Sequence, residues 1–150
     1  MMEKWIKVSE HITVGPQPTE EELEHFLKEG FKGVVNLREP GEPNQMLSPE
    51  AEGAKVQGLG MEYLHFPVSV KSLTDDLVDD FCSQLTGLPR PVLVHCGTGM
   101  RAGALCMMAL GVEEQMSGEE ALNKAKAMGF ECKSEDLKAF VKDYLDKRNL

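Results

Sequence analysis

Residues 91–111 constrain the fold most, because a short glycine-containing turn there joins two apolar segments. The first, PVLVHC (91–96), is short and continuously apolar, which is typical of a strand buried on both faces of a parallel sheet. The second, AGALCMMALG (102–111), is apolar all round, which predicts a buried central helix. A strand and a helix that both need covering indicate a layered α/β core.

The rest of the chain alternates short strands with helices. Further strands are predicted at 5–9, 12–15, 32–38 and 61–68. Helices are predicted to follow the capping residues Thr19, Ser48 and Thr74, and over 117–129 and 134–148. This alternation predicts a single α/β domain over residues 1–150, with a mostly parallel central sheet flanked by helices.

Composition excludes several classes of function. The net charge of -9 argues against nucleic acid or an anionic membrane as a partner, because both attract basic surfaces. The sequence contains no run of about 18 apolar residues, the length that a membrane-spanning helix needs. The N-terminus has no apolar signal region, so a cytoplasmic location is expected. The four cysteines form no CxxC pair and no Cys/His cluster with zinc spacing, so neither a metal nor another cofactor is expected.

The turn LVHCGTGMRAG (93–103) carries the chemistry of the chain. Cys96 lies between a strand and a helix N-terminus, where backbone N–H groups and the helix dipole favour negative charge. Gly97 and Gly99 allow the backbone to fold into an anion-binding nest. The guanidinium of Arg101 matches two oxygens of a phosphate, and His95 is placed to orient the turn. The pattern predicts a reactive thiolate beside an oxyanion site.

The remaining cysteines show no such pattern. Cys82 and Cys106 fall on apolar helix faces and are predicted to be packing residues, while Cys132 has no evident partner in the sequence. The candidate chemistry therefore rests on Cys96.

Several stretches resemble the protein tyrosine phosphatase superfamily, and within it the bacterial beta-lactamase-hydrolase-like (DUF442) group. They are VGPQPTEEELEHFLKEGFKGVVNLREPGE, GMEYLHFPV, VLVHCGTGMRAGAL and MSGEEALNKAKAMGF. That group is known for a C-x4-R loop, so the four residues between Cys96 and Arg101, one fewer than in the usual phosphatase loop, fit it. The resemblance implies a dual-specificity-like phosphatase fold, Cys96 as nucleophile and Arg101 as phosphate clamp. It also implies a cradle of backbone amides from Gly97, Thr98, Gly99, Met100 and Arg101.

Two departures from the family pattern bear on the activity. Ala102 follows the arginine where Ser or Thr is usual, and Thr98 is the hydroxyl that remains inside the loop. Ser69 and Val70 stand where dual-specificity relatives carry a general-acid Asp. Losing a general acid costs a factor of about 10²–10⁴, so a slow phosphatase is expected.

Asp75 and Asp76 are the nearest acidic alternatives, as groups that could swing towards the loop. They also fit a solvated helix face, since carboxylates in a first turn are favoured by the helix dipole. A catalytic role for either residue therefore stays open at this point.

Three functions are compatible with the sequence. The first is cysteine-dependent hydrolysis of a phosphorylated small molecule or phosphoprotein. The second is sulfur transfer through a Cys96 persulfide, because rhodanese-like loops are also C-x4-R in many members. The third is a phosphate-binding module without turnover. His95 before the cysteine, and the order of the preceding motifs, favour the first.

Overall fold

The computed structural model describes residues 4–129 and 134–148. The strands are β1 (Ile6–Lys7), β2 (Ile12–Gly15), β3 (Gly33–Asn36), β4 (Glu62–His65) and β5 (Val92–His95). The helices are α1 (Glu20–Lys28), α2 (Pro49–Gly58), the 3-10 helix η2 (Val70–Ser72), α3 (Asp75–Thr86), α4 (Met100–Glu113), α5 (Gly118–Ala127) and α6 (Glu135–Arg148). Cys132 falls outside the described ranges.

The strands form one five-stranded sheet in the order β1-β2-β5-β3-β4. All neighbours pair in parallel except β1 and β2 at one edge, which pair antiparallel. The predicted α/β class with a mostly parallel sheet is therefore confirmed. No helix in the described ranges is long and apolar enough to cross a membrane.

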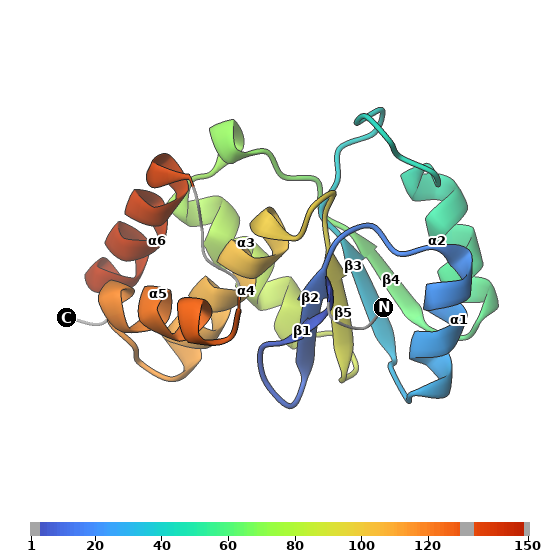
Figure 1. The fold of residues 1–150 in the computed structure, drawn as a ribbon, viewed down its shortest axis with the longest axis horizontal. Helices are drawn as coiled ribbons and strands as arrows, with labels where there is room; N and C mark the ends of the chain where they lie inside the picture. Colours follow the sequence, from blue (N-terminus) through green and yellow to red (C-terminus); the bar gives the residue numbers. More distant parts are fainter. Residues whose placement is uncertain (1–3, 130–133, 149–150) are drawn as a thin grey trace.

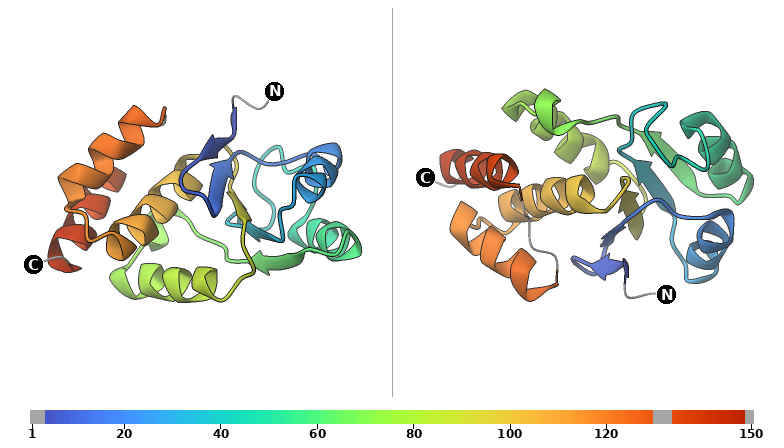
Figure 2. Two further views of the ribbon diagram at one scale, coloured as in Figure 1. Left: turned by 90° about the horizontal axis from the view of Figure 1, so that it is seen from below. Right: turned by 45° about the horizontal axis from the view of Figure 1, so that its top comes forward.

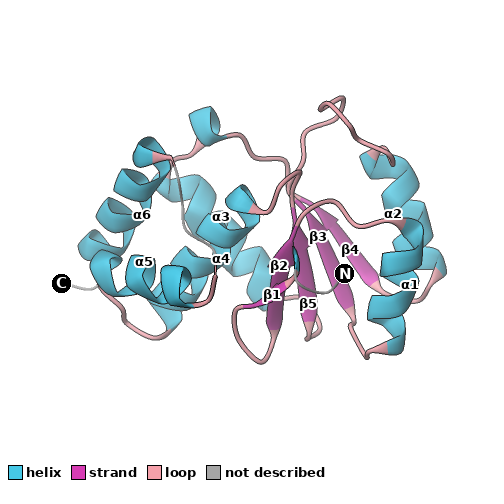
Figure 3. Cartoon of the chain, viewed as in Figure 1, coloured by secondary structure: helices cyan, strands magenta, loops and turns pink. Residues whose placement is uncertain are grey.

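The sheet is covered on both faces, as Figures 1 and 3 show, with α1 and α2 on one side and α3 to α6 on the other. Alternating residues of the central strands supply the two cores. Val34 and Leu93 pack with Phe26 of α1, whereas Val35 and Val94 pack with the α4 side. The predicted burial of β5 on both faces is thereby confirmed, and β5 is the middle strand of the sheet.

Helix α4 is the central helix of the larger layer, as the two views of Figure 2 show. It contacts β2, β5, α3, α5 and α6. It begins at Met100, two residues before the apolar segment that predicted it. Two residues of the glycine-containing turn, Met100 and Arg101, therefore belong to the first turn of the helix.

Candidate active site at the carboxyl ends of the strands

Strand register brings three separate loops to one place. Gly15 of β2 and Asn36 of β3 both align with His95 of β5. The chain continues past this level at the carboxyl ends of the three strands, where ligands of open α/β sheets bind. Gln17, Arg38 and Cys96 follow these strand ends and meet at the same edge.

The turn after β5 is fixed by main-chain hydrogen bonds. The Cys96 N–H donates to the Gly15 carbonyl at 3.3 Å, and the Gln17 N–H donates to the Gly97 carbonyl at 3.4 Å. Gly99 has a φ of 102°, in the left-handed region that favours glycine, and it is the N-cap of α4 without a side-chain cap. The first N–H groups of α4 are thus not taken by a capping side chain.

The sulfur of Cys96 lies within this turn. The Gly99 N–H donates to Sγ at 3.1 Å, and the residue exposes no surface. A backbone donor and the N-terminus of a 14-residue helix both stabilise negative charge on a sulfur atom. The structure therefore places a backbone donor and a helix N-terminus at Cys96, and a thiolate there stays a prediction.

Arg101 holds a carboxylate beside the cysteine. Its Nη1 donates to Glu42 Oε2 at 2.7 Å and its Nη2 donates to Oε1 at 2.8 Å, a two-pronged pairing. Nη1 also donates to the Val68 carbonyl at 2.7 Å. The pairing with Arg101 lowers the pKa of Glu42 to about 2. The hydrogen bond with Glu42 raises the pKa of Arg101 against the opposing effect of desolvation.

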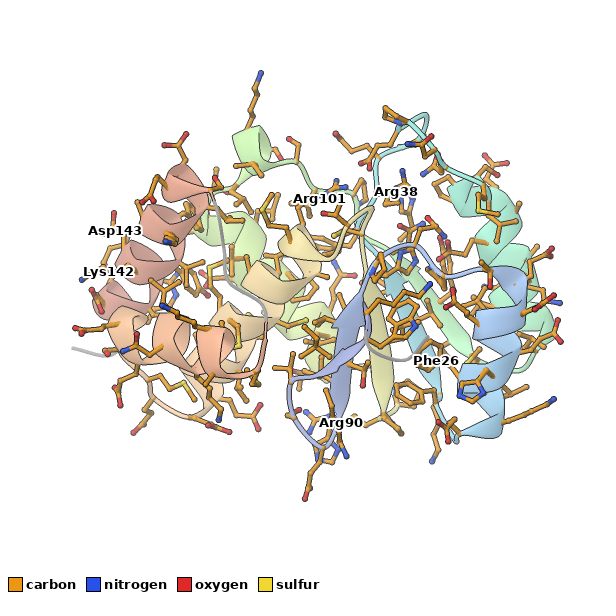
Figure 4. The ribbon with its side chains drawn as sticks, in the orientation of Figure 1. Phe26, Arg38, Arg90, Arg101, Lys142 and Asp143 are labelled. Carbon is orange, nitrogen blue, oxygen red and sulfur yellow. The ribbon has the colours of Figure 1, made fainter. Side chains whose placement is uncertain are left out.

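A second arginine meets the same carboxylate. Arg38 Nε donates to Glu42 Oε1 at 3.1 Å, while Nη1 donates to Gln17 Oε1 at 3.0 Å and Nη2 to the Pro43 carbonyl at 2.6 Å. Arg38 is only 3% exposed. Two guanidinium groups therefore bind one carboxylate. Figure 4 labels Arg38 and Arg101 at the same end of the sheet.

A buried chain of polar side chains connects Arg38 to His95, the residue before Cys96. His95 Nε2 lies 2.6 Å from Glu52 Oε2, and Gln17 Nε2 donates to Glu52 Oε1 at 2.7 Å. Gln17 Oε1 then accepts from Arg38. His95 and Glu52 expose no surface, so each polar atom of the pair needs its partner inside the protein.

The structure places most of the predicted site residues together. Those of the turn are Cys96, Gly97, Thr98, Gly99, Met100 and Arg101, with His95 at the end of β5 and Ala102 buried in α4. Thr98 is exposed. Asp75 and Asp76 lie in the first turn of α3, where Asp75 accepts a hydrogen bond from Lys147 Nζ of α6 at 2.7 Å and Asp76 is exposed.

Sequence reasoning missed Glu42, Glu52 and Gln17. Glu52 carried a usable signal, because it lies four residues before the apolar Val56 on the predicted helix and so shares its buried face. Glu42 lies in a loop whose path the sequence does not specify. Arg38 could be placed at a strand end, but not against a particular partner.

Comparisons with known proteins agree with this geometry. A family model described as "DSP-PTPase phosphatase fused to NAD+ Kinase" matches residues 3–143. A "Beta-lactamase hydrolase-like protein" of Xylella fastidiosa is 28% identical over 128 residues, covering 85% of this chain but 30% of that protein. The chain thus spans about 30% of the length of this curated relative.

Solved structures share the fold. The DUF442 protein of Shewanella putrefaciens superimposes with a TM-score of 0.80 at 18% identity, covering 98% of this chain and 94% of that one. TpbA of P. aeruginosa, crystallised with pTyr, gives a TM-score of 0.76 at 19% identity, covering 97% and 90%. At these identities the likeness shows a common architecture.

Proposed function

The chain belongs to the family of DSP-PTPase phosphatases described as fused to NAD+ kinase, and from this we propose that it hydrolyses phosphate monoesters through a phosphocysteine formed at Cys96. One observation carries the proposal. The guanidinium of Arg101 binds the Glu42 carboxylate through both Nη atoms, and its Nη2 lies 3.6 Å from a methyl group built on Gly97, the residue after Cys96. A phosphoryl group held by the same Nη atoms would lie next to the nucleophile.

The reaction balances with the groups present. The Cys96 thiolate attacks phosphorus, an S–P bond forms and the P–O ester bond breaks; the leaving oxygen takes a proton from an acidic side chain or from water and departs as the alcohol or phenol. Water then attacks phosphorus and gives up a proton to solvent, the S–P bond breaks, the thiolate is regenerated and inorganic phosphate is released. In both steps Arg101 and the amides of the turn stabilise charge on the equatorial oxygens.

Protonation of the leaving group is the weak step of this site. Of the two candidate acids, Asp75 is nearer in sequence to the position where relatives carry the general acid. It would have to break its hydrogen bond with Lys147 to act. Ala102 has no hydroxyl to stabilise the departing thiolate. We therefore expect slow turnover, with good leaving groups such as p-nitrophenol hydrolysed faster than unactivated phenols.

The substrate class follows from the same chemistry. TpbA, which shares the fold, has been crystallised with pTyr. We propose a phosphorylated protein or small molecule as the substrate, with an aryl phosphate as a suitable probe. No metal is required in this scheme, because the nucleophile and the clamp are both side chains.

The test is steady-state hydrolysis of p-nitrophenyl phosphate from pH 5 to 8 by the native protein, Cys96→Ser and Cys82→Ser. Cys82 is a half-buried cysteine of α3 and serves as the matched control. We expect turnover by the native protein and Cys82→Ser, and none by Cys96→Ser. A pH limb that disappears in Asp75→Asn or Asp76→Asn would identify the acid.

Equal turnover by Cys96→Ser and the native protein would refute the phosphocysteine. Absence of turnover in the native protein, together with formation of thiocyanate from thiosulfate and cyanide, would replace phosphate chemistry with sulfur transfer.

A further inference from the structure

Arg38 is a buried cation whose orientation is fixed from several sides. Gln17 and the Pro43 carbonyl hold its two terminal nitrogens, and its own carbonyl lies 2.6 Å from His65 Nε2. Its backbone N–H donates to Asn36 Oδ1 at 2.9 Å. Only Nε points at Glu42, so this N–H is a preset donor that needs no rearrangement to meet an anion in that position.

The Arg38 guanidinium also lies over the turn itself. A methyl group built on Gly97 would stand 3.7 Å from Arg38 Nε and 3.6 Å from Arg101 Nη2. Both guanidinium groups thus flank the first residue after the nucleophile. This position is the mouth of the nest in which the backbone amides would meet a phosphoryl group.

The short loop has one backbone donor fewer than the usual phosphatase loop, and Arg38 can supply a donor in its place. A turn with four residues between Cys96 and Arg101 offers one backbone N–H fewer than a turn with five. An oxyanion in the shorter turn therefore lacks one donor, and an unmade hydrogen bond to a charged group is costly. The Arg38 Nε–H is a donor at the carboxyl edge of the sheet, beside the turn. It comes from the segment that follows β3 and not from the turn.

We propose that Arg38 is a second phosphoryl-binding residue that replaces the donor missing from the C-x4-R loop, and that Glu42 occupies the phosphoryl position until substrate displaces it. The proposal rests on the phosphatase function above. It adds a residue outside the signature loop to the binding site, and it assigns a place-holding role to Glu42.

Charge supports the exchange. A thiolate, a phosphate dianion and Glu42 would together bring four negative charges against the two of Arg38 and Arg101. Expelling Glu42 reduces the excess to one. Glu42 is half-buried, with 17% of its side chain exposed, and both arginines are held by main-chain carbonyls as well as by Glu42. Cys96 exposes no surface, so some neighbouring group must move before phosphorus can reach the sulfur.

The experiment measures binding of inorganic phosphate by titration calorimetry to Cys96→Ser protein, which cannot turn over. Arg38→Gln is introduced into this background and compared with Arg90→Gln. Arg90 is exposed at the opposite end of the sheet in Figure 4, so its loss changes the net charge equally without touching the site. We expect Arg38→Gln to weaken binding roughly 10- to 150-fold, the loss of one hydrogen bond to a charged group, and Arg90→Gln to leave binding unchanged.

Glu42→Gln keeps the proposal testable if Arg38→Gln fails to fold. Its neutral amide pairs less well with the two arginines, so phosphate is expected to bind more tightly than to the parent. Unchanged or weaker binding to Glu42→Gln would overturn the proposal, as would equal affinities of folded Arg38→Gln and Arg90→Gln.

Turnover separates this proposal from the phosphatase function. Hydrolysis that depends on Cys96, with the same kcat/KM in Arg38→Gln, would overturn the role of Arg38 alone. Phosphate binding that depends on Arg38, without hydrolysis by the native protein, would overturn the phosphatase function while supporting the two-arginine site.

Discussion

The buried pair of Glu52 and His95 offers the sharpest test of what holds the site in place. Glu52 projects from α2 and accepts hydrogen bonds from both His95 and Gln17. The side chains of Glu52 and His95 expose no surface. Replacing Glu52 by Ala removes both acceptors at once. His95 Nε2 then lies in a fully buried position without an acceptor, whereas Gln17 Nε2 keeps the Pro18 carbonyl at 3.2 Å.

The cost of this substitution can be worked from the contacts. Leaving a buried donor without its acceptor costs about 1–3 kcal/mol. For a chain of this size each kcal/mol lowers Tm by about 2–4 °C, which gives a fall of about 2–12 °C. Glu52→Gln keeps the volume but has one acceptor oxygen for the same two donors, so a smaller loss is expected.

The measurement is urea unfolding followed by the fluorescence of Trp5, the only tryptophan and a buried one. Glu50→Ala is the control, because Glu50 lies in the same first turn of α2 but is exposed. That variant loses only the helix-dipole contribution, about 0.3–1 kcal/mol. If Glu52→Ala and Glu50→Ala unfolded within about 0.5 kcal/mol of each other, the pair would not stabilise the protein and the reasoning would be refuted.

Two further predictions concern the loop and its place-holding carboxylate. Because the pKa of folded Glu42 lies at about 2, below its usual 4.5, its stabilising contribution is complete above 4.5 and is lost as the pH falls towards 2. Urea midpoints of the native protein should therefore fall more steeply over that range than those of Glu42→Gln, and parallel curves would contradict the pairing with Arg101. Gly99→Ala should cost about 1–3 kcal/mol, because Ala resists a φ of 102°. Gly58→Ala, at an uncrowded position in α2, should cost nothing by the same urea titration, and equal losses would contradict the role of the turn.

The fold was largely readable from the sequence because local signals agreed with one another. Thr19, Ser48 and Thr74 each cap the helix that they predict, and their side chains accept from the expected backbone N–H groups. The ends were less accurate: the strands predicted at 32–38 and 61–68 cover only Gly33–Asn36 and Glu62–His65, and α4 starts inside the turn with Gly99 as its N-cap. Glycine gives no capping signal of its own, so an apolar pattern alone places that helix start too late.

The site was readable only in part, because half of it comes from the register between distant strands. Cys96 and Arg101 are neighbours along the chain, and their spacing carries the prediction. Arg38 and Gln17 join them only because β2, β3 and β5 end at one level. Glu42 reaches Arg101 across 59 residues of sequence, a separation that no local pattern encodes.

A net charge of -9 would be expected to repel a phosphate, but most of the acidic residues act only if they lie close to the proposed site. Surface charges farther than about 10 Å from the site are screened at an ionic strength near 0.1 M. An anion in the site would lie within hydrogen-bonding distance of its donors, which belong to fixed groups. These are the amides of the turn, Arg101 held by the Val68 carbonyl, and Arg38 held by Gln17 and the Pro43 carbonyl. In a partly buried site such groups act at a lower effective dielectric than the distant acidic surface does. On the proposal made above, the acidic surface and Glu42 would both oppose adventitious anions, and a substrate would displace Glu42 by binding both arginines and the turn at once.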